Sequence, residues 1–274
     1  MTARIHCIVT GEVESNLHIA LLNGAGHPDI SDDQRMPHGY PDTVVLRSGE
    51  TRVGNMVPAP VWLITGGEKL ILIDTGLGDV DEAMDIQARY GSDYMASRSE
   101  GQDIVGGLAR HGVAPEDIDI VVLTHLHYDH VGNNELFPNA RFIVQKDEID
   151  LALDPPRFCM FYYPEFAYKL RAVQDRLDII DGDHRIDENV ALLKVGGHTP
   201  GCQAVLVKTD VGTVCLTSDL MYNYRNLELD WPTGSFWNLE QMIDGYRRVR
   251  EEADVIVPQH DWQILVEHPS GSIG

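Results

Sequence analysis

The chain has 274 residues and a formal net charge of −22, because 43 acidic side chains oppose 21 basic ones. This charge disfavours nucleic acid and anionic membrane surfaces as partners, since both are negatively charged. Hydrophobic residues make up 43% of the chain, which is enough to bury a sizeable core. No apolar run approaches the roughly 20 residues that a membrane span needs. We therefore expect one large domain or two small ones, with neither a nucleic-acid nor a membrane role.

The N-terminal part of the chain combines two features. It has no apolar core of the kind found in signal peptides, so we expect a cytoplasmic protein. Residues 1–55 are rich in Gly, Pro, Asp and His. Such a composition is typical of loops, and we expect a loop-rich extension packed on the main domain. No cysteine belongs to a C-x-x-C pair, and free thiols are expected in this setting.

Apolar runs and amphipathic stretches follow one another from about residue 59 onward. APVWLITGG and EKLILIDTG, joined through Gly66 and Gly67, predict a β-hairpin, and IDIVVLT is apolar enough to predict a buried strand. Further strands are expected at ARFIVQ, ALLKVGG, QAVLVKT, GTVCLTS and DVIVPQ. Helices are expected at DIVGGLARHGV, from Lys146 to about Leu153, and at NLEQMIDGYRRVREEA, with Asn238 as the N-cap. Because hairpins and helices are mixed, two mixed sheets covered by helices fit better than one parallel sheet.

The segment THLHYDH, residues 124–130, follows the buried strand and contains three histidines and an aspartate. On extended backbone His125, His127 and Asp129 point the same way, and His130 must reach a different place. One ion cannot readily take all four side chains, whereas two adjacent ions can share them. Imidazole and carboxylate ligands suit zinc, manganese or iron. A solvated polar loop is the alternative, but only 12 of 274 residues are histidine, which makes this cluster improbable by chance.

Three more candidate ligands each follow an apolar run: His198, Asp219 and His260. Taken alone, a histidine at a strand end is more often a structural residue held by hydrogen bonds. Taken together, the three repeat the same order of apolar strand and then ligand, at the place where α/β folds put their chemistry. The sequence therefore predicts seven ligands for a pair of metal ions.

These residues carry a resemblance to a known family. H-x-H-x-D-H, the later GHTPG, then SD and a final QH resemble the metallo-β-lactamase superfamily of metal hydrolases, and LIDTG at residues 72–76 resembles its upstream strand and turn. The resemblance covers about residues 58–262 and implies a single α/β domain, an αββα sandwich of two mixed β-sheets flanked by helices. It implies that Asp74 orients a ligand. It also implies how the seven ligands divide: His125, His127 and His198 on one ion, Asp129, His130 and His260 on the other, and Asp219 on both.

Within the superfamily, the chain resembles the N-acyl homoserine lactonases, because Tyr222 stands three residues after Asp219 in SDLMY. In those enzymes a tyrosine at this offset hydrogen-bonds the lactone carbonyl. The resemblance implies opening of a lactone ring, most of all that of an N-acyl homoserine lactone quorum signal, or of a related small lactone. Tyr222 and Asp129 are then catalytic, with Asp129 passing a proton to the leaving alkoxide. Alternatively, Tyr222 is one of ten tyrosines and only packs, and Tyr224 stands close by.

The cofactors implied are two divalent metal ions, with zinc expected and manganese, iron or cobalt allowed. The main alternative is a thioester hydrolase of the glyoxalase II type or another small-ester metallohydrolase, although glyoxalase II enzymes add a helical C-terminal domain and only fourteen residues follow His260. An iron persulfide oxygenase and a metal sensor without activity stay open. A nuclease is disfavoured by the negative charge, and an exported β-lactamase by the lack of a signal.

Two points stay open at the level of sequence. The aromatic residues within 158–168 fit either a lid over an apolar acyl chain or an ordinary helix core. A homodimer is neither required nor opposed by any feature of the sequence.

Overall fold

The computed structural model describes the whole chain except residues 1, 16, 23–42, 46–50, 54 and 158–165. Its larger sheet consists of eight strands: β1 (Arg4–Ser15), β4 (Asn55–Thr65), β5 (Ile71–Ile73), β6 (Ala96–Ser97), β7 (Ile120–Val122), β8 (Arg141–Gln145), β9 (Leu177–Ile180) and β15 (Ser272–Ile273). The smaller sheet consists of five: β10 (His184–Arg185), β11 (Val190–Lys194), β12 (Gln203–Thr209), β13 (Gly212–Leu216) and β14 (Val255–Val257). A separate pair is formed by β2 (Thr43–Val45) and β3 (Thr51–Val53).

The helices of the described residues are mostly short. They are α1 (Leu17–Ala20), α3 (Val80–Arg89), α4 (Ile104–Ala109), α5 (Tyr128–Val131), α6 (Lys146–Leu153), α7 (Phe166–Arg171), α8 (Tyr224–Glu228), α9 (Leu239–Glu252) and α10 (Gln263–Glu267). Short 3₁₀ turns join some of them: η1 (Pro115–Asp117), η2 (Asn134–Leu136), η4 (Gln174–Arg176) and η5 (Ser218–Leu220). Among the described residues, none of the helices combines the length and the apolar character that crossing a bilayer requires.

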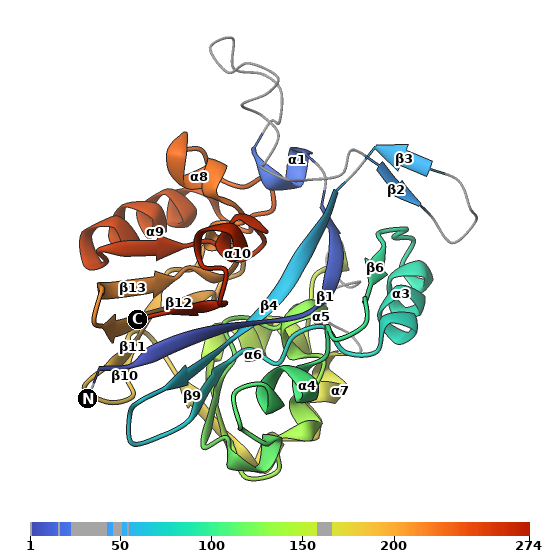
Figure 1. The fold of residues 1–274 in the computed structure, drawn as a ribbon. Helices are drawn as coiled ribbons and strands as arrows, with labels where there is room; N and C mark the ends of the chain where they lie inside the picture. The colour runs from blue at the N-terminus through green and yellow to red at the C-terminus, as the bar shows by residue number, and fades with distance from the viewer. Residues whose placement is uncertain (1, 16, 23–42, 46–50, 54, 158–165) are drawn as a thin grey trace.

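The two sheets pack face to face, and helices cover the outer face of each (Figure 1). The larger sheet has the order β15-β1-β4-β5-β7-β8-β9, with β6 paired to β1, and the smaller has the order β10-β11-β12-β13-β14. Parallel and antiparallel pairs occur in both: β5 and β7 are parallel and β4 and β5 antiparallel, while β13 and β14 are parallel and β12 and β13 antiparallel. The predicted αββα sandwich of two mixed β-sheets is confirmed.

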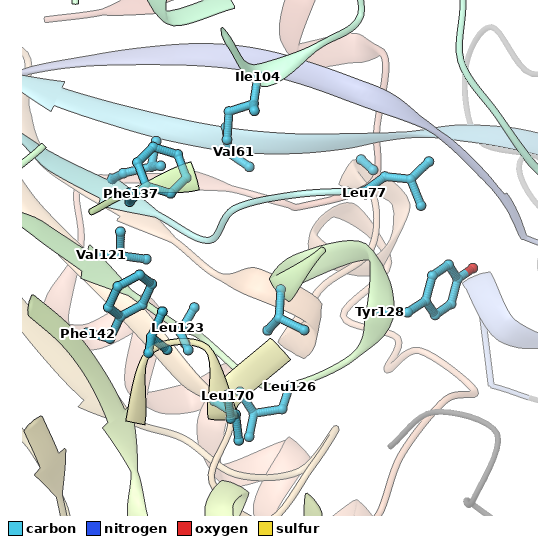
Figure 2. Close-up of a cluster of buried hydrophobic side chains, with 14 of the residues drawn as sticks. Val61, Leu77, Ile104, Val121, Leu123, Leu126, Tyr128, Phe137, Phe142 and Leu170 are labelled. Atoms are coloured by element: carbon cyan, nitrogen blue, oxygen red, sulfur yellow. The ribbon is translucent and has the colours of Figure 1, made fainter. Parts of the chain in front are cut away.

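Three layers of buried side chains hold the four structural layers together. Helices α3, α4, α6 and α7 pack on the larger sheet through a cluster that includes Val121 and Phe142 (Figure 2). A second cluster fills the space between the sheets, and a third joins the smaller sheet to α9. Strand β7 serves two of these layers, because Val121 faces the helices while Ile120 and Val122 face the other sheet. Burial of both faces explains why this strand is apolar throughout.

The expectation that the first 55 residues are mainly loop is wrong for residues 4–15. These form β1, which pairs antiparallel with β4 and buries Ile5 and Ile8. The sequence pattern is hidden because the register shifts between Val9 and Glu12, and this β-bulge interrupts the alternation of inward and outward side chains. Residues 23–42, which dominate the loop-like composition, lie outside the described part of the chain.

Strand direction explains why the predicted ligands meet. β7 runs parallel to β5, and β13 runs parallel to β14; two antiparallel steps through β12 give β11 the direction of β13. His125, His198, Asp219 and His260 come after the carboxyl ends of β7, β11, β13 and β14. Loops at the carboxyl ends of such strands share one edge of the fold, where α/β proteins bind their ligands.

The turn after β5 packs directly on the backbone around α5. Thr75 N donates to His130 O at 2.7 Å, and Gly132 N donates to Gly76 O at 2.9 Å. A Cβ atom added to Gly132 would lie 2.1 Å from Gly78 N, closer than two such atoms can approach. Glycine at this position therefore allows the two segments to touch.

We expect Gly132→Ala to destabilise the protein by about 1–3 kcal/mol, since the obstructing atoms are backbone and cannot rotate away. Gly67→Ala is the matched control, because its added Cβ would be 3.7 Å from Asp187 Oδ2, an ordinary contact. The control should stay within about 0.5 kcal/mol of the wild type. Urea unfolding of the metal-loaded proteins measures both, and equal stabilities of the two variants would contradict the close backbone packing.

Candidate metal centre

The structure brings all seven predicted ligands to one place. Their ligand atoms form two buried groups, and within each group these atoms lie within 4.8 Å of one another: His125, His127, His198 and Asp219 in the first, and Asp129, His130 and His260 in the second. The first two histidines come from the loop after β7, and Asp129 and His130 from the single turn of α5. The division into two groups follows from the positions of the side chains alone.

Asp219 lies between the two groups. Its Oδ2 atom is 3.3 Å from His198 Nε2 and 3.8 Å from His125 Nε2. Its Oδ1 atom is 3.1 Å from His260 Nε2 and 3.2 Å from His130 Nε2. Each carboxylate oxygen thus faces a different group, which is the geometry that a bridging carboxylate requires.

The outer nitrogens of three histidines are held by oxygen atoms. His130 Nδ1 donates to Asp74 Oδ2 at 2.7 Å, and His260 Nδ1 donates to Pro58 O at 2.8 Å. His198 Nδ1 similarly donates to a backbone carbonyl, that of residue 235, at 2.9 Å. A carbonyl or carboxylate can only accept, so these bonds place the ring hydrogen on Nδ1 and leave the Nε2 lone pair for a cation.

His127 is oriented the other way. Its Nδ1 atom, not its Nε2 atom, lies 3.1 Å from His198 Nε2 and faces the first group. Two ring nitrogens of neutral histidines at this separation repel through their lone pairs unless one of them carries a hydrogen or both face a cation. A shared cation would resolve this contact, because each ring nitrogen could direct its lone pair at the cation.

Asp74 connects the centre to the strand before it. It adopts a left-handed backbone conformation, with φ of 62°, and its two carboxylate oxygens accept from Thr124 N, Thr124 Oγ1 and His130 Nδ1, each at 2.7 Å. Burial raises the pKa of Asp74, and the hydrogen bonds from His130 and Thr124 oppose that rise. The side chain therefore fixes the loop of the first motif and orients one predicted ligand.

The charges of the centre fit two cations. Burial holds the pKa of His125, His127 and His198 below the usual range, which keeps these rings neutral as ligands must be. Burial alone would raise the pKa of Asp219, but the neighbouring His260 and His130 hold it well below its usual range. The buried atoms His125 Nε2, His130 Nε2 and Asp219 Oδ1 have no hydrogen-bond partner in the part of the chain that the structure describes. Unpartnered donors of electron pairs around a buried carboxylate are what a metal pair would satisfy.

A pocket opens onto the centre and encloses about 470 Å³ of space not filled by atoms, part of it open to solvent. Among the described residues, four predicted ligands line it: His127, Asp129, Asp219 and His260. The other lining residues are Val13, Glu14, Ser15, Ile19, Val57, Gln87, Tyr94, Tyr128 and Tyr222. The aromatic residues 158–165 lie outside the described part of the chain, so their role as lid or core stays a prediction.

The structure separates Tyr222 from Tyr224. Tyr222 lines the pocket, with its ring centre 5.0 Å from that of His260 and 5.8 Å from that of His198. Tyr224 instead begins α8, and burial raises its pKa next to Glu267, to which it is hydrogen-bonded. Only the first of these tyrosines is therefore among the residues that line the pocket.

Sequence reasoning missed Glu148, a fully buried acid on α6. Its Oε2 atom accepts from Leu126 N at 3.1 Å, and its Oε1 atom accepts from Gly201 N at 2.9 Å. It thereby joins the loop of the first motif to the GHTPG loop. The available signal was its position on the helix, because Glu148 shares the buried face with Leu151 and Ala152, three and four residues on.

We expect Glu148→Gln to change how stability depends on pH. Burial raises the pKa of Glu148 from 4.5 to about 7. Between these values the folded protein holds a proton that the unfolded chain has released, so this group's contribution to stability falls as pH rises and is constant above about 7. Glutamine does not titrate. The free energy of unfolding of the variant, relative to that of the wild type, should therefore rise by ~3 kcal/mol from the lower to the upper end of this pH range.

Urea unfolding of metal-loaded protein across this pH range measures the difference. Glu251→Gln, at an exposed position of α9, is the matched control and should follow the wild type at every pH. The glutamine amide also cannot accept both backbone N–H groups, so metal occupancy of Glu148→Gln should fall. A constant difference between wild type and variant would show that Glu148 does not titrate in this range.

An αββα sandwich with two groups of metal ligands at the edge of its sheets defines a class of metal-dependent hydrolases. The comparisons with known proteins agree: the model of the metallo-beta-lactamase superfamily matches residues 54–260. The chain therefore belongs to the metallo-beta-lactamase superfamily.

The relatives that it matches include several named lactonases. The N-acyl homoserine lactonase AiiA of Bacillus thuringiensis subsp. kurstaki is 31% identical over 223 residues, which cover 76% of this chain and 84% of that protein. The N-acyl homoserine lactonase AttM of Azorhizobium caulinodans is 32% identical over 203 residues, which cover 69% and 71%. A solved N-acyl homoserine lactone hydrolase, with N-hexanoyl-L-homoserine bound at its catalytic metal center, superposes with a TM-score of 0.74 at 26% identity, covering 97% of each chain.

Proposed function

We propose that this protein is a metal-dependent hydrolase that opens the ring of an N-acyl homoserine lactone, a quorum signal, or of a related small lactone. The observation that carries the proposal is the pair of ligand groups joined by Asp219, with Tyr222 beside them in one pocket. The similarity to named lactonases over most of the chain supports the choice of substrate class. One hydrolase domain is proposed for the whole chain.

The roles proposed for the ligands follow their grouping. His125, His127 and His198 would hold one divalent ion, Asp129, His130 and His260 the other, and Asp219 would bridge both. When bound, such ions lower the pKa of water and polarise a carbonyl group. Zinc is the proposed metal because imidazole and carboxylate are among its usual ligands. A cytoplasmic location is proposed from the sequence, and a homodimer is left as a hypothesis.

The protein's own side chains would complete the reaction. Tyr222, which lines the pocket, would donate its hydroxyl hydrogen to the carbonyl oxygen of the ring, where negative charge develops during attack. Asp129 lines the same pocket, with Oδ2 3.7 Å from both His130 Nε2 and His260 Nε2. Its carboxyl group would take a proton from the attacking water and pass it to the ring oxygen that leaves.

The substrate class is tested with purified, metal-loaded protein and a panel of lactones, thioesters and phosphodiesters. We expect two divalent ions per chain by elemental analysis and proton release with lactones. Removing the ions with a chelator should abolish the activity, and adding zinc should restore it. Turnover of thioesters alone would favour a thioester hydrolase instead, and bound metal without turnover of any substrate would favour a metal sensor.

Asp129→Asn should lower kcat by about 100-fold or more, because an amide cannot carry the proton to the leaving oxygen. The loss should be measured together with metal content, since the same side chain is a proposed ligand. Asp154→Asn, at an exposed position after α6, is the matched control and should keep full activity. Unchanged turnover at full metal occupancy would remove Asp129 from the proton-transfer role.

Tyr222→Phe should lower kcat/KM for lactones by roughly 100-fold with metal content unchanged, because the ring keeps its packing and loses only the hydroxyl donor. Tyr90→Phe changes an exposed tyrosine, 39% accessible, and controls for the loss of a phenol elsewhere. If Tyr222→Phe retained full activity, the alternative that Tyr222 only packs would be correct.

A further inference from the structure

One wall of the pocket carries two buried polar side chains, each with one atom that has no hydrogen-bond partner within the described residues. Ser15 is 3% exposed and Gln87 is 2% exposed, and both line the pocket. Ser15 Oγ and Gln87 Nε2 have no hydrogen-bond partner among the described residues. A buried polar group without a partner destabilises a fold, so such groups are uncommon and call for an explanation.

The framework fixes the position of both side chains. Ser15 ends β1, and Gln87 lies in the last turn of α3. β6 lies beside both elements, pairing with β1 through Val13 and Ala96 and contacting α3. The carbonyl end of Gln87 is already engaged, because Gln87 Oε1 accepts from Ser92 Oγ at 3.1 Å. Among the described residues, the amide nitrogen is therefore the unpartnered end of a side chain whose other end is held.

The chemistry of this pair matches a secondary amide. Gln87 Nε2 can only donate, and a carbonyl oxygen accepts from it; Ser15 Oγ can accept from an N–H group. The reverse orientation of the Gln87 amide exchanges the two roles and keeps the match. Glu14 lies on the same wall and accepts from Met95 N at 2.9 Å. Its carboxylate, in a chain of net charge −22, disfavours an anionic group at this place.

We infer that Ser15 and Gln87 form a subsite for a neutral amide attached to the ring of the substrate, and that this subsite sets the preference for amide-bearing lactones. The inference rests on the proposed function and deepens it. The ligand groups and Tyr222 act on the ring, which all lactones share. The subsite acts on the substituent, which differs from one lactone to another. Recognition by a site built for hydrogen bonding rejects an analogue that lacks the group, because its polar atoms are then left unpaired.

The test compares two substrates on four metal-loaded proteins. The substrates are N-hexanoyl homoserine lactone and a γ-lactone with an alkyl chain of similar length and no amide. The proteins are the wild type, Ser15→Ala, Gln87→Met and the control Gln174→Met, which changes an exposed glutamine away from the pocket. For each protein, kcat/KM is measured for both substrates, and thermal unfolding and metal content are recorded.

We expect the ratio of kcat/KM for the amide lactone to that for the alkyl lactone to fall about 5- to 100-fold in Ser15→Ala and in Gln87→Met. For the alkyl lactone, kcat/KM should be the same in these two variants as in the wild type. The thermal midpoint of Ser15→Ala should stay the same or rise, because this variant removes a buried polar atom that has no partner among the described residues. Gln87→Met also removes the hydrogen bond from Ser92 Oγ, which offsets that gain. The control should match the wild type in all measurements.

An unchanged ratio in an active protein would overturn the subsite and leave the proposed function in place. An equal loss on both substrates, with a lower thermal midpoint, would also overturn it, since the two residues would then be structural. A wild type that opens neither lactone would overturn the proposed function, and the subsite with it. These outcomes are distinguishable because the alkyl lactone reports on ring opening without the amide.

Discussion

The constraint on which the site depends is a carboxylate, Asp219, buried among histidines at the junction of two sheets. A buried charge is costly unless opposite charge and hydrogen bonds surround it. Burial lowers the pKa of His125, His127 and His198, so these three rings supply no charge. Within the described residues, Asp219 Oδ1 also has no hydrogen-bond partner. The arrangement becomes favourable once positive charge lies on both sides of the carboxylate, as its two oxygens facing separate ligand groups indicate. Metal binding and folding of this edge are therefore coupled.

That coupling explains how the surrounding residues are used. Asp74 fixes the first motif from the side of the larger sheet, Glu148 ties it to the loop after β11, and the close backbone contact at Gly132 holds α5 against the turn after β5. Each contact acts between loops that are distant in sequence. Ligands carried on loops reach metal-binding precision only when such contacts remove the freedom of the loops.

The sequence predicts the parts of this molecule that are locally encoded. Each candidate ligand follows an apolar strand, the hairpin of β4 and β5 forms as the pattern indicates, and Asn238 Oδ1 accepts from Gln241 N at 3.0 Å as expected of an N-cap. What escapes prediction depends on tertiary structure. The bulge in β1 hides a strand within a loop-like composition. Ser15 and Gln87 are ordinary polar residues until the fold buries them, whereas for Glu148 the only local signal is its place on the apolar face of α6.

The contrast between residues that the local sequence predicts and residues that only the tertiary fold brings into the pocket suggests how substrate specificity could arise. The residues that would act on the ring follow strand ends, whereas another wall of the pocket is formed by β1 and α3, the one a bulged strand and the other a surface helix. One fold can serve different substrates by changing such a wall while keeping its reactive centre. Buried polar atoms without a partner among the described residues, Ser15 Oγ and Gln87 Nε2, lower the stability of the free protein. A substrate that forms hydrogen bonds with these atoms would remove that cost on binding. Discrimination between substituents then follows from the same buried atoms that make the empty wall unfavourable.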